Sequence, residues 1–195
     1  MTRNRWQKQY YKRKRNDTIL YVKPHCNLTV RLVENPVKVV RIFAVDDTCI
    51  QVDNEKTAYK LKEKYPDKVY NISVRYACWC FDRHDNRIKV LDMPQSVFNA
   101  IGQQSKLRTK KISDLEEGCD WKITTNGEKG LKVRYTVHYV EESPLSAVER
   151  NIVTFQKIDK KSPFDLTKIY TGDSFLDASV KLSKVVGGLE MIGAL

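Results

Sequence analysis

Aromatic and basic side chains alternate along one segment of the sequence, a combination that can hold a single nucleic-acid strand. In residues 69–83 the odd positions include Arg75, Trp79, Phe81 and Arg83. Alternate residues of a strand share a face, so two large rings would lie between two guanidinium groups. Cations neutralise phosphates and rings stack on bases, which makes this face a candidate nucleic-acid site. The alternative is that both rings fill a core, as most aromatic residues do.

A second group of basic residues lies near the predicted strands 119–125 and 131–140. Lys122 sits between Trp121 and Ile123, and Lys132 and Arg134 alternate with apolar residues. These three cations would therefore form a basic stripe along one edge of a sheet. An ordinary solvated sheet face would have the same pattern, so both interpretations stay open.

The positive charge of the chain is concentrated at its beginning. The 195 residues contain 35 Lys and Arg against 24 Asp and Glu, a formal net charge of +11. Residues 1–23 hold eight of those cations, Asp17 and the interleaved rings of Trp6, Tyr10 and Tyr11. This charge favours an anionic polymer or an anionic lipid as partner. We predict that this segment is a basic flexible arm, or alternatively a solubilising tail. We predict no bilayer span, because no apolar run approaches ~20 residues.

The residues that could bind metal or perform catalysis do not form a recognised motif. The five cysteines are an odd set without the density of a disulfide scaffold, which predicts free thiols in a reducing cytoplasm. They lack the CxxC pair of a zinc ribbon, although His25 with dispersed cysteines stays open as a zinc site. Turn and capping roles explain the carboxylates Asp82, Asp85 and Asp92. No nucleophile elbow, HExxH motif or phosphate loop is present. We therefore expect no enzymatic activity, no cofactor and no bound metal.

Residue patterns predict a chain of short strands with a few helices. The expected strands are 28–33, 37–45, 48–52, 69–82, 87–91, 119–125 and 131–140, with a hairpin as the simplest connection of the first two. The last two strands join across Asn126-Gly127, a dipeptide that favours tight turns. Asp92 is the expected N-cap of a helix over 96–101, and further helices are expected at 54–65, 145–151 and 173–186.

This order favours a mainly β fold with added helices. We predict a single Greek-key barrel of the oligonucleotide-binding (OB) type in residues 24–143, with a helical insertion at 54–65. The basic arm, residues 1–23, would precede it, and a helical C-terminal extension, residues 144–195, would follow it. A βαββαβ sandwich of the RNA-recognition type is the alternative, disfavoured because its paired ring motif is not recognisable.

Four ordered segments resemble a known family. They are residues 74–83 (VRYACWCFDR), 87–101 (RIKVLDMPQSVFNAI), 121–127 (WKITTNG) and 131–137 (LKVRYTV). Together they resemble the single-stranded DNA-binding proteins of tailed phages and related viruses, the helix-destabilising type. The resemblance implies an OB fold that coats single strands in replication, recombination and repair, here in the host-cell cytoplasm. It also implies that the basic run Lys12, Arg13, Lys14 and Arg15 contacts a neighbouring protomer and makes binding cooperative.

The residue patterns predict a nucleic-acid-binding protein, and the resemblance implies a sequence-tolerant single-stranded DNA-binding protein of viral origin. Its expected partners are single-stranded DNA, further copies of itself along the strand, and replication or recombination proteins. The alternatives are an interaction subunit of a viral replication or transcription complex, and an RNA-binding protein. The predicted nucleic-acid contacts are Arg75, Trp79, Phe81, Arg83, Lys89, Lys122, Lys132 and Arg134.

Overall fold

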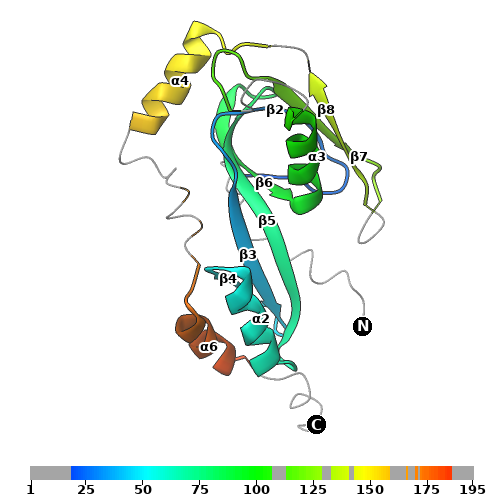
Figure 1. Ribbon diagram of the computed structural model, residues 1–195, viewed down its shortest axis with the longest axis vertical. Helices are drawn as coiled ribbons and strands as arrows, with labels where there is room; N and C mark the ends of the chain where they lie inside the picture. Colours follow the sequence, from blue (N-terminus) through cyan, green and yellow to red (C-terminus); the bar gives the residue numbers. More distant parts are fainter. Residues whose placement is uncertain are drawn as a thin grey trace. The chain divides into compact units, whose positions relative to one another are not determined.

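The computed structural model describes residues 19–106, 113–128, 133–140, 143–158, 166, 170 and 172–185. Within them the protein is mainly β, with four helices and a mixed sheet (Figure 1). The mainly β prediction is therefore confirmed. The predicted cooperativity residues Lys12, Arg13, Lys14 and Arg15, and the predicted contact Lys132, lie outside the described residues.

The strands follow a path that does not close into a barrel. Its order is β1-β6-β5-β2-β7-β8, and β3 pairs with β4 and β5. Only the β1–β6 pair is parallel among the registered pairs of the described strands. The strands are β1 (Ile19–Tyr21), β2 (Asn27–Leu32), β3 (Val37–Ala44), β4 (Cys49–Val52), β5 (Val69–Asp82), β6 (Arg87–Pro94), β7 (Asp120–Thr125) and β8 (Tyr135–Val140).

The described residues divide into two compact units. One unit combines residues 38–74 with the described residues after 167, and the other combines the described residues of the ranges 17–37 and 75–166. The predicted helical insertion and the predicted last helix thus belong to one unit.

The unit formed by 17–37 and 75–166 has its core between the curved sheet and one helix. Side chains from β2, β5, β6, β7 and β8 point into this core, including Val30, Cys78, Cys80 and Trp121. The helix α3 (Gln95–Lys106) adds Val97 and Ile101, and its Phe98 ring stacks on Tyr76 with 3.8 Å between centroids. The Gln104 amide donates a hydrogen bond to the Val137 carbonyl of β8 (2.6 Å). Helix α3 therefore packs against β8, the last strand of the path, and against β6.

The other unit packs two helices on one face of the β3–β4 pair. The helix α2 (Glu55–Lys64) begins at Asn54, whose side chain accepts a hydrogen bond from the Thr57 amide. The helix α6 (Phe175–Ser183) begins at the equivalent cap Ser174. Their apolar sides meet the strands in a separate core: Val40, Ile42, Ala44, Ile50, Val52, Ala58, Leu61, Val69, Ala178, Leu182 and Val185.

Two local predictions are wrong, and one strand was not predicted. The segments 28–33 and 37–45 do not form a hairpin, because β2 pairs with β5 and β7 whereas β3 pairs with β4 and β5. Asp92 is no helix cap, since β6 runs on to Pro94 and Asp92 is buried in an ion pair with Arg75. The short strand β1 pairs in parallel with β6. The β5–β6 and β7–β8 hairpins are confirmed.

Candidate nucleic-acid interface

The two rings predicted to lie on an open face of β5 are buried. Alternation along the strand holds, because Cys78 and Cys80 point into the core cluster that contains Trp121. However, Trp79 is only 5% exposed and Phe81 is 0% exposed. Both faces of this part of β5 are therefore covered, and the prediction that these rings are open to bases is wrong.

The cations predicted beside those rings bind carboxylates of the same chain. Arg75 pairs with Asp92, and Arg83 pairs with Asp120 (2.8 Å) and Glu149 (2.5 Å). Burial alone would lower the pKa of Arg83, but its hydrogen bond and charge pairing with Asp120 and the pairing with Glu149 raise it overall. The predicted phosphate contacts Arg75 and Arg83 are thus largely neutralised within the protein.

Lys89, another predicted contact, is also paired. It lies beside Asp85 and donates a hydrogen bond to Asp82 (2.9 Å). Burial lowers the pKa of Lys89, but its hydrogen bonds and charge interactions with these two carboxylates outweigh that effect and raise it. This lysine therefore stabilises the β5–β6 turn, and the two carboxylates already neutralise its charge.

Arg31 lies at the centre of a buried polar cluster next to Arg83. Its guanidinium is fully buried and donates to the backbone carbonyls of Ser143 (2.9 Å) and Asp114 (3.0 Å). Arg83 donates to the same Ser143 carbonyl (3.2 Å) and holds Asp120. Burial lowers the pKa of Arg31, and the nearby Asp120 charge opposes this. The cluster anchors the segments around 114 and 143 to the sheet.

The outer face of β2, β7 and β8 remains polar and carries two predicted contacts. Cross-strand pairing places its side chains in rows, because residues opposite each other on one face are neighbours. Lys122 and Arg134 are exposed, and their apolar neighbours Ile123 and Tyr135 lie in or against the core, as the alternation predicted. One row is Asn27, Thr124 and Thr136, and the next is Thr29, Lys122 and His138.

These two rows contain a cation, an imidazole, hydroxyls and an amide, and no carboxylate. The following row pairs Arg31 with Asp120 and Val140, and Arg83 holds that Asp120 carboxylate. Sequence reasoning missed Asn27 and Thr29, since nothing local indicates that β2 lies beside β7. The face thus offers hydrogen-bond donors and positive charge without a competing free carboxylate in its first two rows.

The β7–β8 turn holds the end of this polar face. Gly127 has a φ of +78°, and the Asn126 side chain accepts a hydrogen bond from the Arg134 amide (3.0 Å). The exposed His25 lies against the turn, because its amide donates to the Thr125 hydroxyl (2.7 Å). A Cβ at Gly127 would approach the His25 ring to 3.0 Å, so both the φ angle and the contact favour glycine there.

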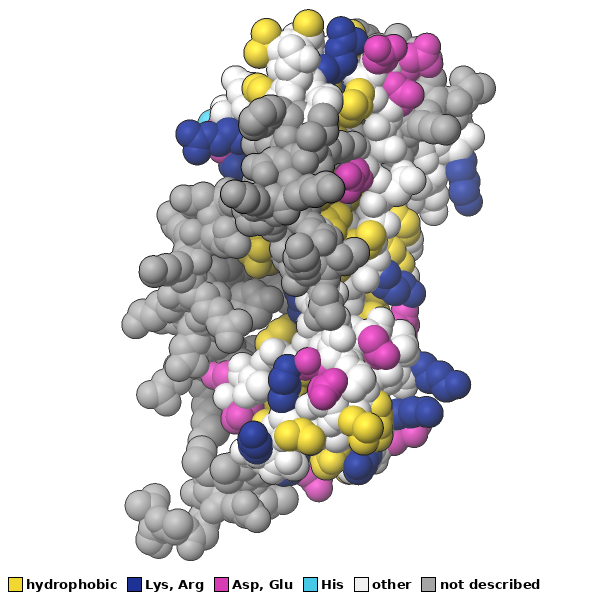
Figure 2. Space-filling view, turned by 90° about the vertical axis from the view of Figure 1, so that its left-hand side faces the viewer, with side chains coloured by type: hydrophobic (Ala, Val, Ile, Leu, Met, Phe, Trp, Pro, Cys, Tyr) yellow, Lys and Arg dark blue, Asp and Glu magenta, His cyan; other side chains and the backbone are white. Residues whose placement is uncertain are grey.

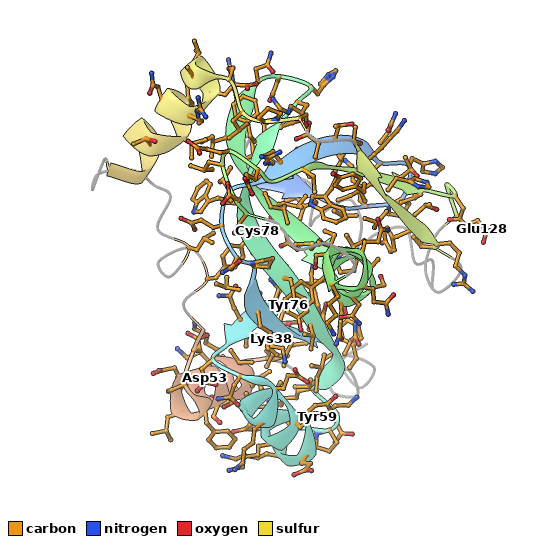
Figure 3. All side chains as sticks on the ribbon, turned by 45° about the horizontal axis from the view of Figure 1, so that its top comes forward. Lys38, Asp53, Tyr59, Tyr76, Cys78 and Glu128 are labelled. Carbon is orange, nitrogen blue, oxygen red and sulfur yellow. The ribbon has the colours of Figure 1, made fainter. Side chains whose placement is uncertain are left out.

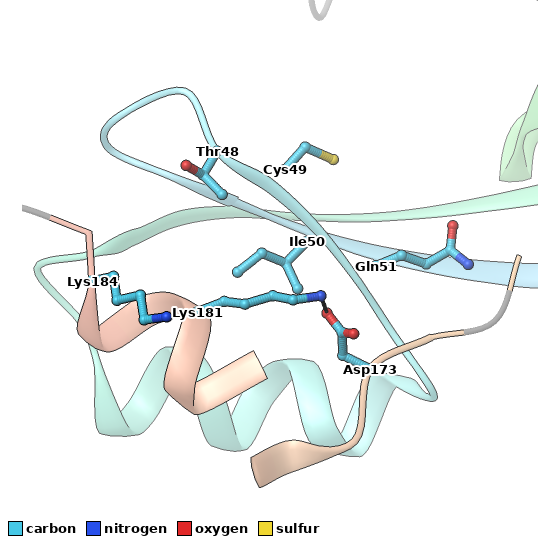
Figure 4. A pocket seen from close by; sticks show the side chains of 7 residues that line it. All are labelled: Thr48, Cys49, Ile50, Gln51, Asp173, Lys181 and Lys184. Atoms are coloured by element: carbon cyan, nitrogen blue, oxygen red, sulfur yellow. Dashed lines mark hydrogen bonds and ion pairs between the residues drawn. The ribbon is translucent and has the colours of Figure 1, made fainter. Parts of the chain in front are cut away.

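A hollow of about 440 Å³ lies in the other unit, between β4 and α6 (Figure 4). Lys181 pairs there with Asp173 (2.5 Å), and Lys184 lies at the end of the helix. The backbone of Asp173 continues the edge of β4 through hydrogen bonds with Gln51 and Asp53. The remaining lining residues are Thr48, Cys49 and Ile50.

The dispersed cysteines and histidines do not come together in the described residues. No group of three His, Cys, Asp or Glu side chains there is arranged to hold a metal ion. None of the five cysteines forms a disulfide, and burial raises the pKa of Cys26, Cys78 and Cys80. None of the described helices combines the length and apolar character needed to cross a membrane.

Comparison with models of known protein families finds no match for the chain, and comparison with curated proteins finds no significant relative.

Proposed function

We propose that this protein binds single-stranded DNA without strong sequence preference and coats it during viral replication, recombination or repair. The observation that carries the proposal is the outer face of β2, β7 and β8, where Lys122, His138 and four hydroxyl or amide side chains stand in two rows without a carboxylate. Exposed Arg134 extends this face towards the β7–β8 turn. A net charge of +11 would favour association with any polyanion.

The connectivity of the strands supports an OB-type architecture. The central strand β2 pairs antiparallel with β5 and with β7, each of which begins a hairpin, and α3 lies between those hairpins in the chain. OB folds are five-stranded, partly open Greek-key barrels, and the turn joining their last two strands often borders the ligand. Here that turn joins β7 to β8 and lies at the end of the polar face. Helix α3, packed on both β6 and β8, would take the place of direct closure.

Binding at this face would depend mainly on phosphates and sugars. Lys122 and Arg134 would neutralise phosphates, the threonines and Asn27 would donate hydrogen bonds, and the His138 ring could stack on a base. With Trp79 and Phe81 buried, no large ring stands in the two rows. Little in such a face distinguishes one base from another, which fits a protein that covers any sequence.

The test is a titration of fluorescent oligo-dT with the parent chain and a Lys122→Glu/Arg134→Glu variant. We expect the variant to lose at least ten-fold in affinity and the parent affinity to fall with salt, with a log–log slope of ~0.7 per phosphate neutralised. Arg87→Gln, at the exposed tip of the β5–β6 hairpin, is the control and should bind like the parent.

The same titration with matching RNA and with duplex DNA separates the alternatives. Tighter binding of RNA than of DNA would show that the protein is an RNA-binding protein. Absence of binding to all three would reject the proposal and favour an interaction subunit. Unchanged affinity of the double variant would remove the β2–β7–β8 face from the binding site.

We further propose that Lys12, Arg13, Lys14 and Arg15 promote self-association along the strand. Deleting residues 1–15 should then weaken coating of long strands more than binding of a short oligonucleotide. Equal losses on both would make the arm a simple DNA contact.

A further inference from the structure

Helix α2 presents lysines and a tyrosine that its own fold does not use. Lys56, Lys60 and Lys62 are exposed, and their side chains make no hydrogen bond or ion pair within the described residues. Tyr59 is 55% exposed and likewise has no recorded ring contact or hydrogen bond there. Figure 3 shows Tyr59 on α2, at the surface of the molecule. The helix therefore combines an exposed aromatic ring with exposed lysines close to it in the sequence.

The packing of α2 uses the opposite side of the helix. Thr57, Ala58 and Leu61 are its buried residues, and Ala58 and Leu61 belong to the core shared with α6. Residues three apart are neighbours on a helix surface, so Tyr59 has Lys56 on one side and Lys62 on the other. Lys60 lies one turn beyond Lys56 on the same side. The four residues Lys56, Tyr59, Lys60 and Lys62 are called the α2 patch below.

The carboxylates near the α2 patch do not cancel its charge. Glu55 is already paired with Lys38, which leaves Glu63 as the carboxylate beside Tyr59 on this helix. The other helix of the unit differs, because α6 exposes apolar Leu176 (74%) and Val180 (56%). Figure 2 shows hydrophobic side chains gathered over that unit on the face it displays. Cations with an exposed ring therefore distinguish α2 from its neighbour.

We propose that the α2 patch is a second contact surface for single-stranded nucleic acid, with Tyr59 stacking on a base and the lysines holding the flanking phosphates. The positive charge of the patch favours an anionic partner. The exposed ring offers a stacking surface, which a nucleic-acid base would use and an anionic peptide would not need. This inference rests on the proposed function and extends it to the unit formed by 38–74 and α6. It predicts that a longer strand is engaged than the β2–β7–β8 face alone could hold.

The test compares Tyr59→Ala, Tyr59→Phe and Lys56→Gln/Lys60→Gln with the parent on long and short oligo-dT. On long strands Tyr59→Ala should lose about five-fold or more in affinity, since a stacked base is lost, whereas Tyr59→Phe keeps the ring and should retain it. The lysine variant should lower the log–log salt slope by about 1.4. Lys184→Gln, an exposed lysine of the same unit, is the matched control and should change neither quantity.

Photocrosslinking of iododeoxyuridine-substituted DNA, with peptide mapping, gives an independent readout that should place a crosslink at Tyr59. Circular dichroism and thermal melting should show that every variant folds, because the substituted side chains are exposed. If Lys122→Glu/Arg134→Glu abolishes binding while all α2 variants bind like the parent without a crosslink at Tyr59, this inference is overturned and the proposed function stands. If the parent binds an acidic peptide in preference to oligo-dT, both fail.

Discussion

Arg31 and Arg134 differ in what their surroundings allow them to do. Arg31 is fully buried, and its guanidinium holds the carbonyls of Ser143 and Asp114 beside Asp120. Arg134 is exposed next to the β7–β8 turn, with its amide fixed by Asn126. A buried guanidinium that satisfies backbone carbonyls contributes to folding, whereas an exposed one can meet a phosphate. The same residue type is therefore structural in one place and a candidate contact in the other.

Replacing Arg31 by alanine should destabilise the fold strongly. The change removes the hydrogen bonds of Arg31 to the Ser143 and Asp114 carbonyls, the packing of its fully buried side chain, and a positive charge beside the buried Asp120. We therefore expect a loss of about 3 to 5 kcal/mol in the free energy of unfolding. Urea denaturation followed by circular dichroism measures it. Arg134→Ala should stay within about 0.5 kcal/mol of the parent. A small loss for Arg31→Ala would mean that the cluster around Ser143 does not hold the fold.

Trp79→Ala tests whether that ring belongs to the core. Because Trp79 is 5% exposed, its removal should leave a cavity and cost about 3 to 5 kcal/mol in the free energy of unfolding. Affinity for oligo-dT, measured where the variant is still folded, should match the parent. Val148→Ala, at a 69% exposed site, is the control for stability. A stable variant with weakened binding would restore Trp79 as a base platform.

The start of helix α4 (Ala147–Ile158) shows how one element is fixed at its end. The Glu149 amide donates to the Ser146 hydroxyl (3.2 Å), and the Ser146 amide donates back to the Glu149 carboxylate (2.7 Å), which is a capping box. The carboxylate also pairs with Arg83 of the sheet. Burial alone would raise the pKa of Glu149, but the Ser146 hydrogen bonds and the Arg83 charge lower it overall.

Glu149→Gln should therefore lower stability in a pH-dependent way. A carboxyl group whose pKa is lowered on folding stabilises the protein above its unfolded pKa, and this contribution is lost as pH falls through the folded value. The parent should be more stable than the variant near pH 7, and the gap should close below about pH 4. Urea midpoints across this range measure the gap. Glu116→Gln, whose side chain is 76% exposed, is the control and should change stability little near pH 7.

At the scale of the whole molecule, two hydrophobic cores stabilise two compact units. The core under α2 depends on α6, which is distant in sequence and supplies Ala178 and Leu182. Lys68 strengthens this contact by donating to the carbonyls of Leu182 (3.3 Å) and Ser183 (3.4 Å) at the end of α6. The last described helix is therefore part of the fold of residues 38–74.

Leu182→Ala should loosen one unit more than the other. Leu182 is fully buried, so we expect a loss of about 2 to 5 kcal/mol from the core under α2. Hydrogen exchange should become faster in β3 and β4, and should change less in β7 and β8, because local opening follows local contacts. Leu176→Ala, on the exposed side of the same helix, is the control. Equal acceleration in all four strands would show that the two cores unfold together.

Local patterns determined much of the secondary structure. The β5–β6 and β7–β8 hairpins and the helices now seen as α2, α3, α4 and α6 lie near their predicted places, and the exposure of Lys122 and Arg134 follows the predicted alternation. These features depend on residues two to four apart, which a sequence displays directly.

Tertiary structure decided which of those surfaces stayed open. Alternation showed that Trp79 and Phe81 share a face, but the same pattern fits an open face and a buried one, and only the structure shows that both rings are buried. Arg83 pairs with Asp120, which is 37 positions away in the chain, and with Glu149, which is 66 positions away. The polar rows exist because β2 lies between β5 and β7. Contacts between distant segments depend on how whole elements pack, and a local pattern carries no information about which partner will cover it.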